Sequence, residues 1–201
     1  MMSSVLILDQ QGNPLHWGSY EDAIVYHAKE LVAWQLGDAD FVRFRGGENR
    51  ITGLQSKIET APIIAIKGES HAYKRNKIPL LTNRELFARD NYTCAYCGHS
   101  FPSYKLSRDH IIPVSRGGKD IWMNVVTACK YDNNKKDDRL LEETGMQLLY
   151  APYIPNRAEA LILKTRNILP VQAEYLGNFI PESSRAHGYI KKITKESQVA
   201  V

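Results

Sequence analysis

The stretch Asp109-His110-Ile111-Ile112-Pro113-Val114-Ser115-Arg116-Gly117-Gly118 carries the most information on how this chain folds. It places a carboxylate beside an imidazole, on an apolar run that ends at a proline and two glycines. We expect a strand over residues 106–112 that ends at the Asp–His pair, followed by a turn. Because successive side chains of a strand point to opposite faces, Asp109 and His110 can face the same way only where the strand twists at its end.

A second pattern lies on either side of this stretch. The chain has three cysteines, of which two form the pair Cys94-x-x-Cys97, while Cys129 lies three residues before Asp132. Two cysteines at this spacing can bind one tetrahedral ion from a tight turn, and a second pair brought close in space completes the site. In a chain without an export signal, this pattern favours metal binding over disulfides. It predicts a structural zinc site with the ligands Cys94, Cys97, Cys129 and Asp132.

The identity of the fourth zinc ligand is open from the sequence. Aspartate can bind zinc through oxygen, but three cysteines with one aspartate are rare among structural sites. Asp132 is one candidate, and water or another side chain is a second. In a third interpretation the thiols bind metal weakly and act as small buried apolar groups. His99 lies only two residues after Cys97, so a closed geometry with this histidine is awkward.

The Asp–His pair has chemistry that suits phosphodiester hydrolysis. This reaction needs an activated water, charge stabilisation at the phosphoryl group and help for the departing oxygen. A neutral imidazole with a pKa near ~6.5 can take a proton from water at cellular pH, which makes His110 the candidate general base. Asp109 offers a hard oxygen ligand of the kind that Mg²⁺ or Mn²⁺ prefers.

These residues resemble the signature of the HNH endonucleases in its His-Asn-Asn form. Asp109-His110, Asn124 and Asn133 occur in the order of that family, with gaps of 14 and 9 residues from the histidine onward. The other matching elements are the C-x-x-C pair, the Ser-x-Gly-Gly turn, Trp122-x-Asn124 and Cys129-x-x-Asp132-Asn133-x-x-Lys136. The resemblance covers roughly residues 82–149. It departs at Asp132, where the family has cysteine, and this puts the zinc site in doubt but not the catalytic one.

The resemblance implies an α+β fold with a ββα-metal, treble-clef-like (His-Me finger) HNH domain. It also implies a metal-dependent endonuclease that acts on DNA, with double-stranded DNA as the expected partner. By resemblance, Asp109 and Asn133 hold one divalent ion, Mg²⁺ or Mn²⁺, and His110 faces the attacking water. Asn124 would hold the following loop and orient His110 by a hydrogen bond. The implied products carry 5′-phosphate and 3′-hydroxyl ends.

Two other functions compete with this interpretation. A nucleic-acid-binding module that keeps the zinc-knuckle fold without turnover is the main alternative. The intact signature argues against it, because a decayed site should lose at least one of its four residues. A thiol redox protein that uses Cys94 and Cys97 is a weaker alternative. The turn at residues 98–102 does not supply the strand–helix scaffold that such a protein needs.

Charge is unevenly distributed along the chain. The net charge is +4 and the isoelectric point is about 8.9. Residues 1–66 carry 5 basic and 8 acidic side chains, residues 67–84 carry 5 and 1, and residues 89–139 carry 9 and 6. Positive charge therefore gathers at the signature and just before it. This is typical of a surface that faces a polyanion, although a solvated face is the default for so small a balance. The candidate phosphate contacts are Arg116, Lys119 and Lys136.

The first 66 residues have the pattern of a small α/β unit. Strands are expected at residues 5–8, 41–44 and 62–66, and a helix follows the capping pair Ser19 and Asp22. The apolar face of this helix reaches Leu31 and includes His27, for which we expect core packing and no ligand role. A specificity element and a homodimer interface are both open as functions of the unit. Residues 67–79 are polar and basic, and predict a linker or a DNA-facing loop.

Short helices are expected around and after the signature. Thr82 and Glu85 form a capping box for a helix that ends near Asp90. Helices are also expected at residues 133–140 with Asp132 as N-cap, at 142–145 and at 158–164, whereas the segment from residue 181 is expected to be loosely ordered. The predicted domains are 1–80, a small α/β unit with a basic linker, 81–150, the HNH domain, and 151–201, a C-terminal extension.

Composition indicates an ordinary globular protein. At 201 residues and 43% hydrophobic content, the chain can bury a core as one domain or two small ones. The apolar run at residues 5–8 lacks a basic leader and a cleavage site, so a signal peptide is not expected. No apolar run is long enough to span a bilayer. The sequence therefore predicts a cytoplasmic protein without a membrane partner.

Overall fold

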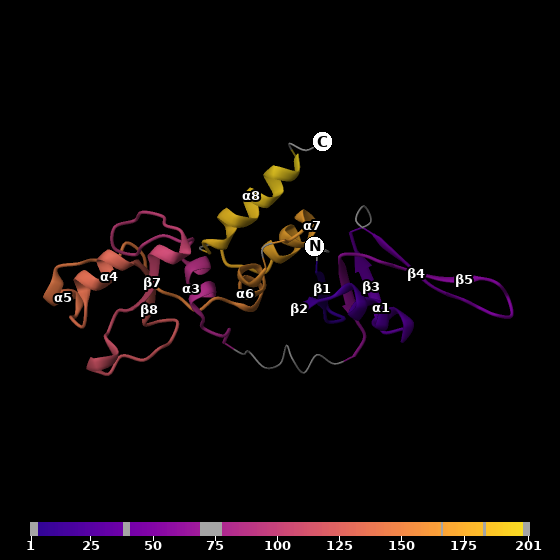
Figure 1. The fold of residues 1–201 in the computed structure, drawn as a ribbon, viewed down its shortest axis with the longest axis horizontal. Helices are drawn as coiled ribbons and strands as arrows, with labels where there is room; N and C mark the ends of the chain where they lie inside the picture. Colours follow the sequence, from indigo (N-terminus) through magenta and orange to yellow (C-terminus); the bar gives the residue numbers. More distant parts are fainter. Residues whose placement is uncertain (1–3, 38–40, 69–77, 166, 183, 199–201) are drawn as a thin grey trace. The chain divides into compact units, whose positions relative to one another are not determined.

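The computed structural model describes residues 4–37, 41–68, 78–165, 167–182 and 184–198. The chain divides into two compact units. The first comprises residues 1–77, 165–180 and 189–201, and the second comprises residues 78–164 and 181–188. Figure 1 labels most of the helices and strands of both. Most of the basic stretch predicted as a linker, residues 69–77, lies outside the described residues.

A four-stranded sheet forms the centre of the first unit. Its strands lie in the order β2-β1-β6-β3, and β1 and β6 are parallel neighbours while the other pairs are antiparallel. The two central strands are the apolar runs expected from the sequence, and they are buried on both faces, as central strands of a covered sheet are. The bounds are β1 (Val5–Leu8), β2 (Pro14–Gly18), β3 (Val32–Leu36) and β6 (Ile63–Ile66).

Helix α1 (Tyr20–Ala28) begins at the predicted cap. Ser19 Oγ accepts a hydrogen bond from the Asp22 amide at 3.1 Å, and Asp22 Oδ2 accepts one from the Ser19 amide at 2.9 Å. The helix buries Tyr20 against the strand residues of the sheet. It ends at Ala28, so Leu31 lies beyond it. His27 is half-buried, and burial lowers the pKa of its imidazole.

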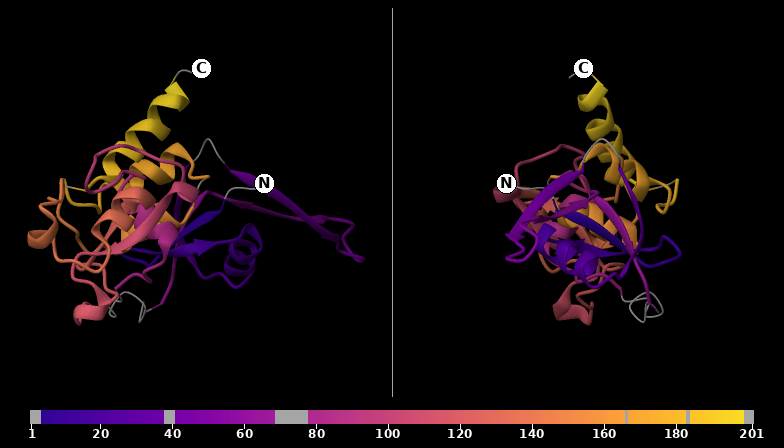
Figure 2. Two further views of the ribbon diagram at one scale, coloured as in Figure 1. Left: turned by 60° about the vertical axis from the view of Figure 1, so that its left-hand side comes forward. Right: turned by 90° about the vertical axis from the view of Figure 1, so that its right-hand side faces the viewer.

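A two-stranded hairpin, β4 (Val42–Glu48) and β5 (Gln55–Thr60), completes the strands of the first unit. Its base packs on the core of that unit through Val42 and Phe44. Its outer half extends away from the four-stranded sheet, as Figure 2 shows. The strand predicted at residues 41–44 is therefore only the first part of β4. Its partner β5 was not predicted, because Gln55–Thr60 is mostly polar and exposed.

The C-terminal segment is ordered into helices, so the prediction of a loosely ordered end is wrong. Helix α7 (Pro170–Gly177) is tied to the first unit by Gln172, whose Nε2 donates to the carbonyls of Ser4 and Pro62, both at 2.8 Å. Helix α8 (Ala186–Gln198) follows. Side-chain bonds to the backbone of distant segments give these residues fixed places that a local pattern does not reveal.

The second unit contains the expected strand–strand–helix order. β7 (Leu106–His110) and β8 (Val125–Cys129) form an antiparallel pair, and α4 (Lys130–Lys136) follows β8 directly. The remaining helices are α3 (Asn83–Arg89), α5 (Leu141–Thr144) and α6 (Arg157–Lys164). Its core contains Leu86, Phe87, Leu106, Trp122 and Val125. The predicted α+β class is confirmed. In the described part of the chain, every helix is too short or too polar to cross a bilayer.

The predicted bounds of one strand and one helix in this unit are wrong, and the helix expected at residues 133–140 spans Lys130–Lys136. β7 ends at His110, two residues before the expected end. Helix α4 begins at Lys130 and not at Asn133, and its N-cap is Cys129, whose Sγ accepts a hydrogen bond from the Asp132 amide at 3.4 Å. Asp132 therefore lies in the first turn of the helix and not at its cap. The sulfur atom takes the capping role that the sequence pattern assigned to the carboxylate.

A buried arginine joins α3 to β8. Arg89 is 1% exposed and pairs with Asp90 through Nε and Oδ1 at 2.8 Å. Its guanidinium also donates to the carbonyls of Trp122 and Val125, both at 2.9 Å. Since arginine presents a rigid fork of donors, this one side chain fixes the loop before β8 and the start of that strand. These are the backbone segments on which the site is built.

Candidate functional site

The two cysteines of the C-x-x-C pair lie on a tight turn between α3 and β7. Gly98 adopts a left-handed conformation with φ of 73°, and its amide donates to the Cys94 carbonyl at 3.0 Å. The Ala95 amide donates to the Thr127 carbonyl at 2.8 Å, which attaches this turn to β8. The turn thereby brings Cys94 and Cys97 to the start of α4, where Cys129 and Asp132 lie.

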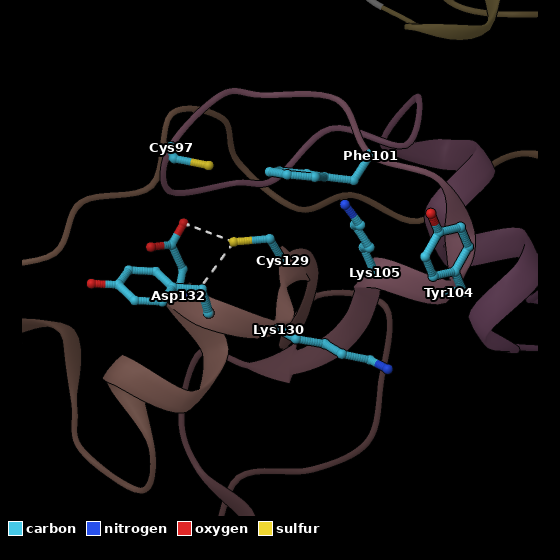
Figure 3. Close-up of a pocket in the computed structure, with 8 residues that line it drawn as sticks. Cys97, Phe101, Tyr104, Lys105, Cys129, Lys130 and Asp132 are labelled. Atoms are coloured by element: carbon cyan, nitrogen blue, oxygen red, sulfur yellow. Dashed lines mark hydrogen bonds between the residues drawn. The ribbon is translucent and has the colours of Figure 1, made fainter.

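The four predicted zinc ligands come together in space. One ligand atom from each of Cys94, Cys97, Cys129 and Asp132 lies within 4.8 Å of every other. The Sγ atoms of Cys94 and Cys129 are both 3.2 Å from Asp132 Oδ2. Tetrahedral zinc with Zn–S bonds near 2.3 Å holds its sulfur ligands roughly 3.8 Å apart, so this donor set fits such an ion. Figure 3 shows Cys97, Cys129 and Asp132 turned toward one another.

In this cluster the pKa of the carboxylic acid is lowered and the pKa values of two thiols are raised. Burial alone would raise the pKa of Asp132, but hydrogen bonds from the three cysteine thiols lower it below its ordinary value. Burial raises the pKa of Cys97 to about 12 and also raises that of Cys129. Cys97 and Cys129 therefore hold their protons beside the Asp132 carboxylate, and binding of an ion would release them.

The cluster borders a hollow of about 640 Å³ on the surface of the second unit. Cys97, Cys129 and Asp132 form one wall. The other lining residues are aromatic or basic, and Tyr104 and Tyr131 among them are largely exposed. The full lining is Cys97, Phe101, Tyr104, Lys105, Cys129, Lys130, Tyr131 and Asp132 (Figure 3).

Asp109 and His110 point to opposite sides of β7, as the alternation of a strand requires. Asp109 faces inward and is 3% exposed. Its Oδ1 lies 3.1 Å from Lys136 Nζ, and its Oδ2 accepts a hydrogen bond from the Tyr96 hydroxyl. Burial, followed by the charge of Asp109, raises the pKa of Tyr96 far above its usual value, so this phenol stays a donor.

Lys136 is not a surface residue, so its prediction as a phosphate contact is wrong. Its side chain is 0% exposed, and Nζ donates to Asp109 Oδ1 and to the His110 carbonyl at 2.7 Å. The residue belongs to the last turn of α4, which packs on β7 and leaves the ammonium no path to solvent. A buried carboxylate requires such a partner, because an unpaired charge in this environment is costly.

His110 faces outward and has a carboxylate partner that the sequence did not suggest. Its Nε2 lies 2.8 Å from Asp120 Oδ1. The other oxygen of Asp120 accepts a hydrogen bond from Arg108 Nη1 at 2.5 Å. The Arg108 hydrogen bond is the main cause that lowers the pKa of Asp120. Burial opposes it, and the bond to His110 adds to the lowering. A usable signal was present, since Asp120 is the only acidic residue between His110 and Asn124.

Asn124 holds the loop between β7 and β8. Its Oδ1 accepts a hydrogen bond from the Ile112 amide at 2.9 Å, and its Nδ2 donates to the carbonyls of Ile112 and Lys119 at 3.0 and 2.9 Å. Gly118 lies beneath these bonds, and a Cβ atom there would fall 1.8 Å from the Ile112 carbonyl oxygen. The contacts of Asn124 are with the backbone of the loop, and Asp120 is the side chain bonded to the His110 ring.

Asn133 lies over the inward face of β7. Its Nδ2 donates to Ser107 Oγ at 2.8 Å and to the Arg108 carbonyl at 3.2 Å. Ser107 and Asp109 share that face, so the two residues predicted to hold a divalent ion are on one side of the strand. Their carboxylate and amide oxygens are the donor types of Mg²⁺ or Mn²⁺.

These two residues do not form an open site for a divalent ion. Asp109 is enclosed, and the position of a cation beside its Oδ1 is taken by the Lys136 ammonium. An ion at Asp109 would have to displace Lys136 or share the carboxylate with it. The other predicted phosphate contacts, Lys119 and Arg116, are both exposed, and Arg116 pairs with Glu143 at 2.8 Å.

Residues 94–149 match the family model of the HNH endonucleases. The matched segment contains the thiol–carboxylate cluster, His110, Asn124 and Asn133. This segment is therefore similar to the HNH endonucleases, in agreement with the resemblance of its sequence. A search of the curated proteins gives no match to the chain.

Proposed function

We propose that this HNH domain is an endonuclease that hydrolyses phosphodiester bonds of double-stranded DNA, with His110 as its general base. The observation that carries the proposal is the contact of His110 Nε2 with Asp120 Oδ1 at 2.8 Å, on the outward face of β7 and within the family match. An imidazole that a carboxylate orients at the surface is an arrangement that suits general-base catalysis.

The Asp120 contact selects one tautomer of His110. An ionised carboxylate only accepts hydrogen bonds, and the lowered pKa of Asp120 keeps it ionised at neutral pH. The proton of a neutral His110 ring therefore lies on Nε2, and Nδ1 keeps its lone pair. We assign Nδ1 the role of taking the proton from the attacking water, and Asp120 the role of stabilising the imidazolium that forms.

Several groups around His110 have supporting roles in this proposal. Asn124 fixes the loop that carries Asp120, through its bonds to Ile112 and Lys119. Arg116 and Lys119 are proposed contacts for the negatively charged backbone of the substrate. The cluster of three cysteines and Asp132 is proposed to bind a structural Zn²⁺, which would hold the turn at Cys94 against the start of α4.

A divalent ion, bound as in the family, would neutralise charge at the phosphoryl group. In the arrangement described here, Lys136 supplies the positive charge next to Asp109. This contact favours a second candidate function, a nucleic-acid-binding module without turnover, because an enclosed Asp109 is not free to bind an ion. The two candidates differ in whether DNA is cut.

Nicking of a supercoiled plasmid in Mg²⁺ or Mn²⁺ tests the proposal. We expect the native chain to nick at least about 100-fold faster than His110→Ala, the lower range for loss of a general base. His187→Ala, which removes a partly buried histidine of α8 outside the matched segment, serves as the control and should nick like the native chain. Equal background nicking by the native chain and His110→Ala, with DNA binding retained, would establish the binding module instead.

A further inference from the structure

The basic residues of the first unit gather on the β4–β5 hairpin, residues 42–60. Among residues 1–66 there are five basic side chains, and all but Lys29 lie on this hairpin. Six of the eight acidic side chains in the same stretch lie elsewhere. The four basic residues of the hairpin are Arg43, Arg45, Arg50 and Lys57, and all of them are exposed. The β4–β5 hairpin is therefore a basic element within an otherwise acidic segment, residues 1–66.

Two of these basic residues face each other across the hairpin. In the register of the strands, Arg43 pairs with Glu59, and their side chains form an ion pair at 2.6 Å. The next outward pair on the same face is Arg45 opposite Lys57. Like charges placed directly opposite on neighbouring strands destabilise a hairpin. A pair of this kind indicates that the surface is shaped by something other than the stability of the hairpin itself.

The tip of the hairpin is an ordered turn that exposes apolar side chains. The Asn49 amide donates to the Leu54 carbonyl at 2.9 Å, and the Gly53 amide donates to the Asn49 carbonyl at 2.8 Å. Asn49 Oδ1 also accepts from the Ile51 amide at 2.9 Å. On this turn Ile51 is 94% exposed and Leu54 is 72% exposed. Two large apolar side chains held outward at the end of a basic ribbon indicate a contact surface.

We propose that the β4–β5 hairpin is an arm that binds duplex DNA, with Arg45 and Lys57 on phosphates and with Ile51 and Leu54 against the bases in a groove. A B-form groove about 12 Å wide admits a two-stranded ribbon. Apolar side chains that enter this groove can contact the methyl groups of thymine. Phosphates between Arg45 and Lys57 would also relieve their mutual repulsion. The inference rests on the proposed function, since it names the same duplex as substrate.

Binding measurements on the full chain test the arm without requiring cleavage. The readout is the fluorescence anisotropy of a labelled mixed-sequence duplex, without divalent ions, over a series of salt concentrations. The double variant Arg45→Ala/Lys57→Ala should bind about 10-fold more weakly at 0.1 M salt. The slope of log K against log salt should fall by about 1.8, as expected for two lost phosphate contacts. Its melting temperature should be unchanged or higher, because a repulsive pair is removed.

The matched control is Arg43→Ala/Glu59→Ala, which alters the neighbouring pair without changing the net charge. It should bind within about twofold of the native chain, since an exposed ion pair is worth little. Ile51→Ser/Leu54→Ser should weaken binding and leave the salt slope unchanged, because its lost contacts are apolar. A-form duplex RNA should bind less well than DNA, because its narrow major groove excludes side chains.

The arm proposal would be wrong if Arg45→Ala/Lys57→Ala had the DNA affinity and the salt slope of the native chain. It would also be wrong if an Ile51→Ser/Leu54→Ser variant bound DNA normally but lost self-association in sedimentation, since the tip would then be a contact between copies. Plasmid nicking by the same proteins separates the two proposals. If the native chain binds DNA but does not nick it, the nuclease proposal is wrong. If Arg45→Ala/Lys57→Ala binds and nicks DNA like the native chain, the proposal of a DNA-binding arm is wrong.

Discussion

The Nε2 atom of His110 lies 2.8 Å from Oδ1 of Asp120. Ten residues separate the two along the chain, and the loop that Asn124 closes brings them together. Arg108, two residues before His110 on the same face of β7, bonds to the other oxygen of Asp120. The carboxylate is therefore shared by a permanent cation and an imidazole, and its orientation is fixed from both sides.

Removal of the Asp120 carboxylate should slow nicking with little effect on DNA binding. In Asp120→Ala the His110 ring loses both its orientation and the charge that stabilises its protonated form. We expect a rate at least about 10-fold lower, since the whole general-base contribution is about 100- to 10,000-fold. The control is Asp138→Asn, an exposed acid beyond α4. Equal rates for Asp120→Ala and the native chain would mean that the pair has no part in the reaction.

The lowered pKa of Asp120 predicts how this pair affects stability with pH. A carboxyl group whose pKa is lower in the folded chain than its ordinary 3.8 stabilises the fold above that value, and the effect is lost as pH falls through the folded pKa. The melting temperature of the native chain should therefore exceed that of Asp120→Asn by a small, constant amount above about pH 5. The difference should vanish in stronger acid. A difference that grows on acidification would contradict the assignment.

Strong local patterns in the sequence predicted part of the fold correctly. The apolar runs at residues 5–8 and 63–66 are buried in β1 and β6, and the caps at Ser19 and Thr82 begin α1 and α3. β5 was not predicted because its polar and apolar residues do not alternate clearly and most of them are exposed. α8 was not predicted because it is polar on average and contains Gly188, which lowers helix propensity.

The candidate site was predictable as a set of residues but not as a set of contacts. The spacing of cysteines and the Asp–His pair placed each residue on its element, and strand alternation already required Asp109 and His110 to diverge. The sequence could not reveal that Lys136 is buried beside Asp109 or that Asp120 is bonded to His110. Both contacts depend on tertiary packing, of α4 on β7 in one case and of the loop on itself in the other.

Replacement of Lys136 by an apolar side chain should destabilise the second unit and open Asp109 to cations. Lys136→Met leaves the buried Asp109 carboxylate without its cation, a change that costs about 3–5 kcal/mol in buried ion pairs. We expect a clear fall in melting temperature, which Mg²⁺ or Mn²⁺ should partly restore. In the native chain the same ions should have less effect. Lys136→Met/Asp109→Asn should recover much of the stability without any ion, and failure to do so would argue against the pair as the cause.

A side chain at position 118 should disrupt the loop that carries Asp120. In Gly118→Ala the added Cβ would lie 1.8 Å from the Ile112 carbonyl oxygen and 2.9 Å from Asn124 Nδ2, so the backbone must move. We expect a loss of about 2 kcal/mol or more in the free energy of unfolding, together with reduced nicking. Gly188→Ala is the control, since a Cβ there meets no atom within 4 Å. Equal stability of the two variants would show that the loop can adapt.

Metal content tests the cluster of three cysteines and Asp132. The four ligand atoms lie within 4.8 Å of one another, so we expect about one zinc per chain after purification in zinc-containing medium. Because binding of structural zinc is coupled to folding, its removal by a chelator should lower the melting temperature markedly. Asp132→Cys restores the ligand type of the family and should retain zinc at lower free-metal concentrations, whereas Asp132→Ala should lose it more readily. Less than about half an equivalent of zinc, unchanged in Asp132→Cys, would mean that these side chains do not form a metal site, and that Cys94 and Cys129 serve only as small buried groups.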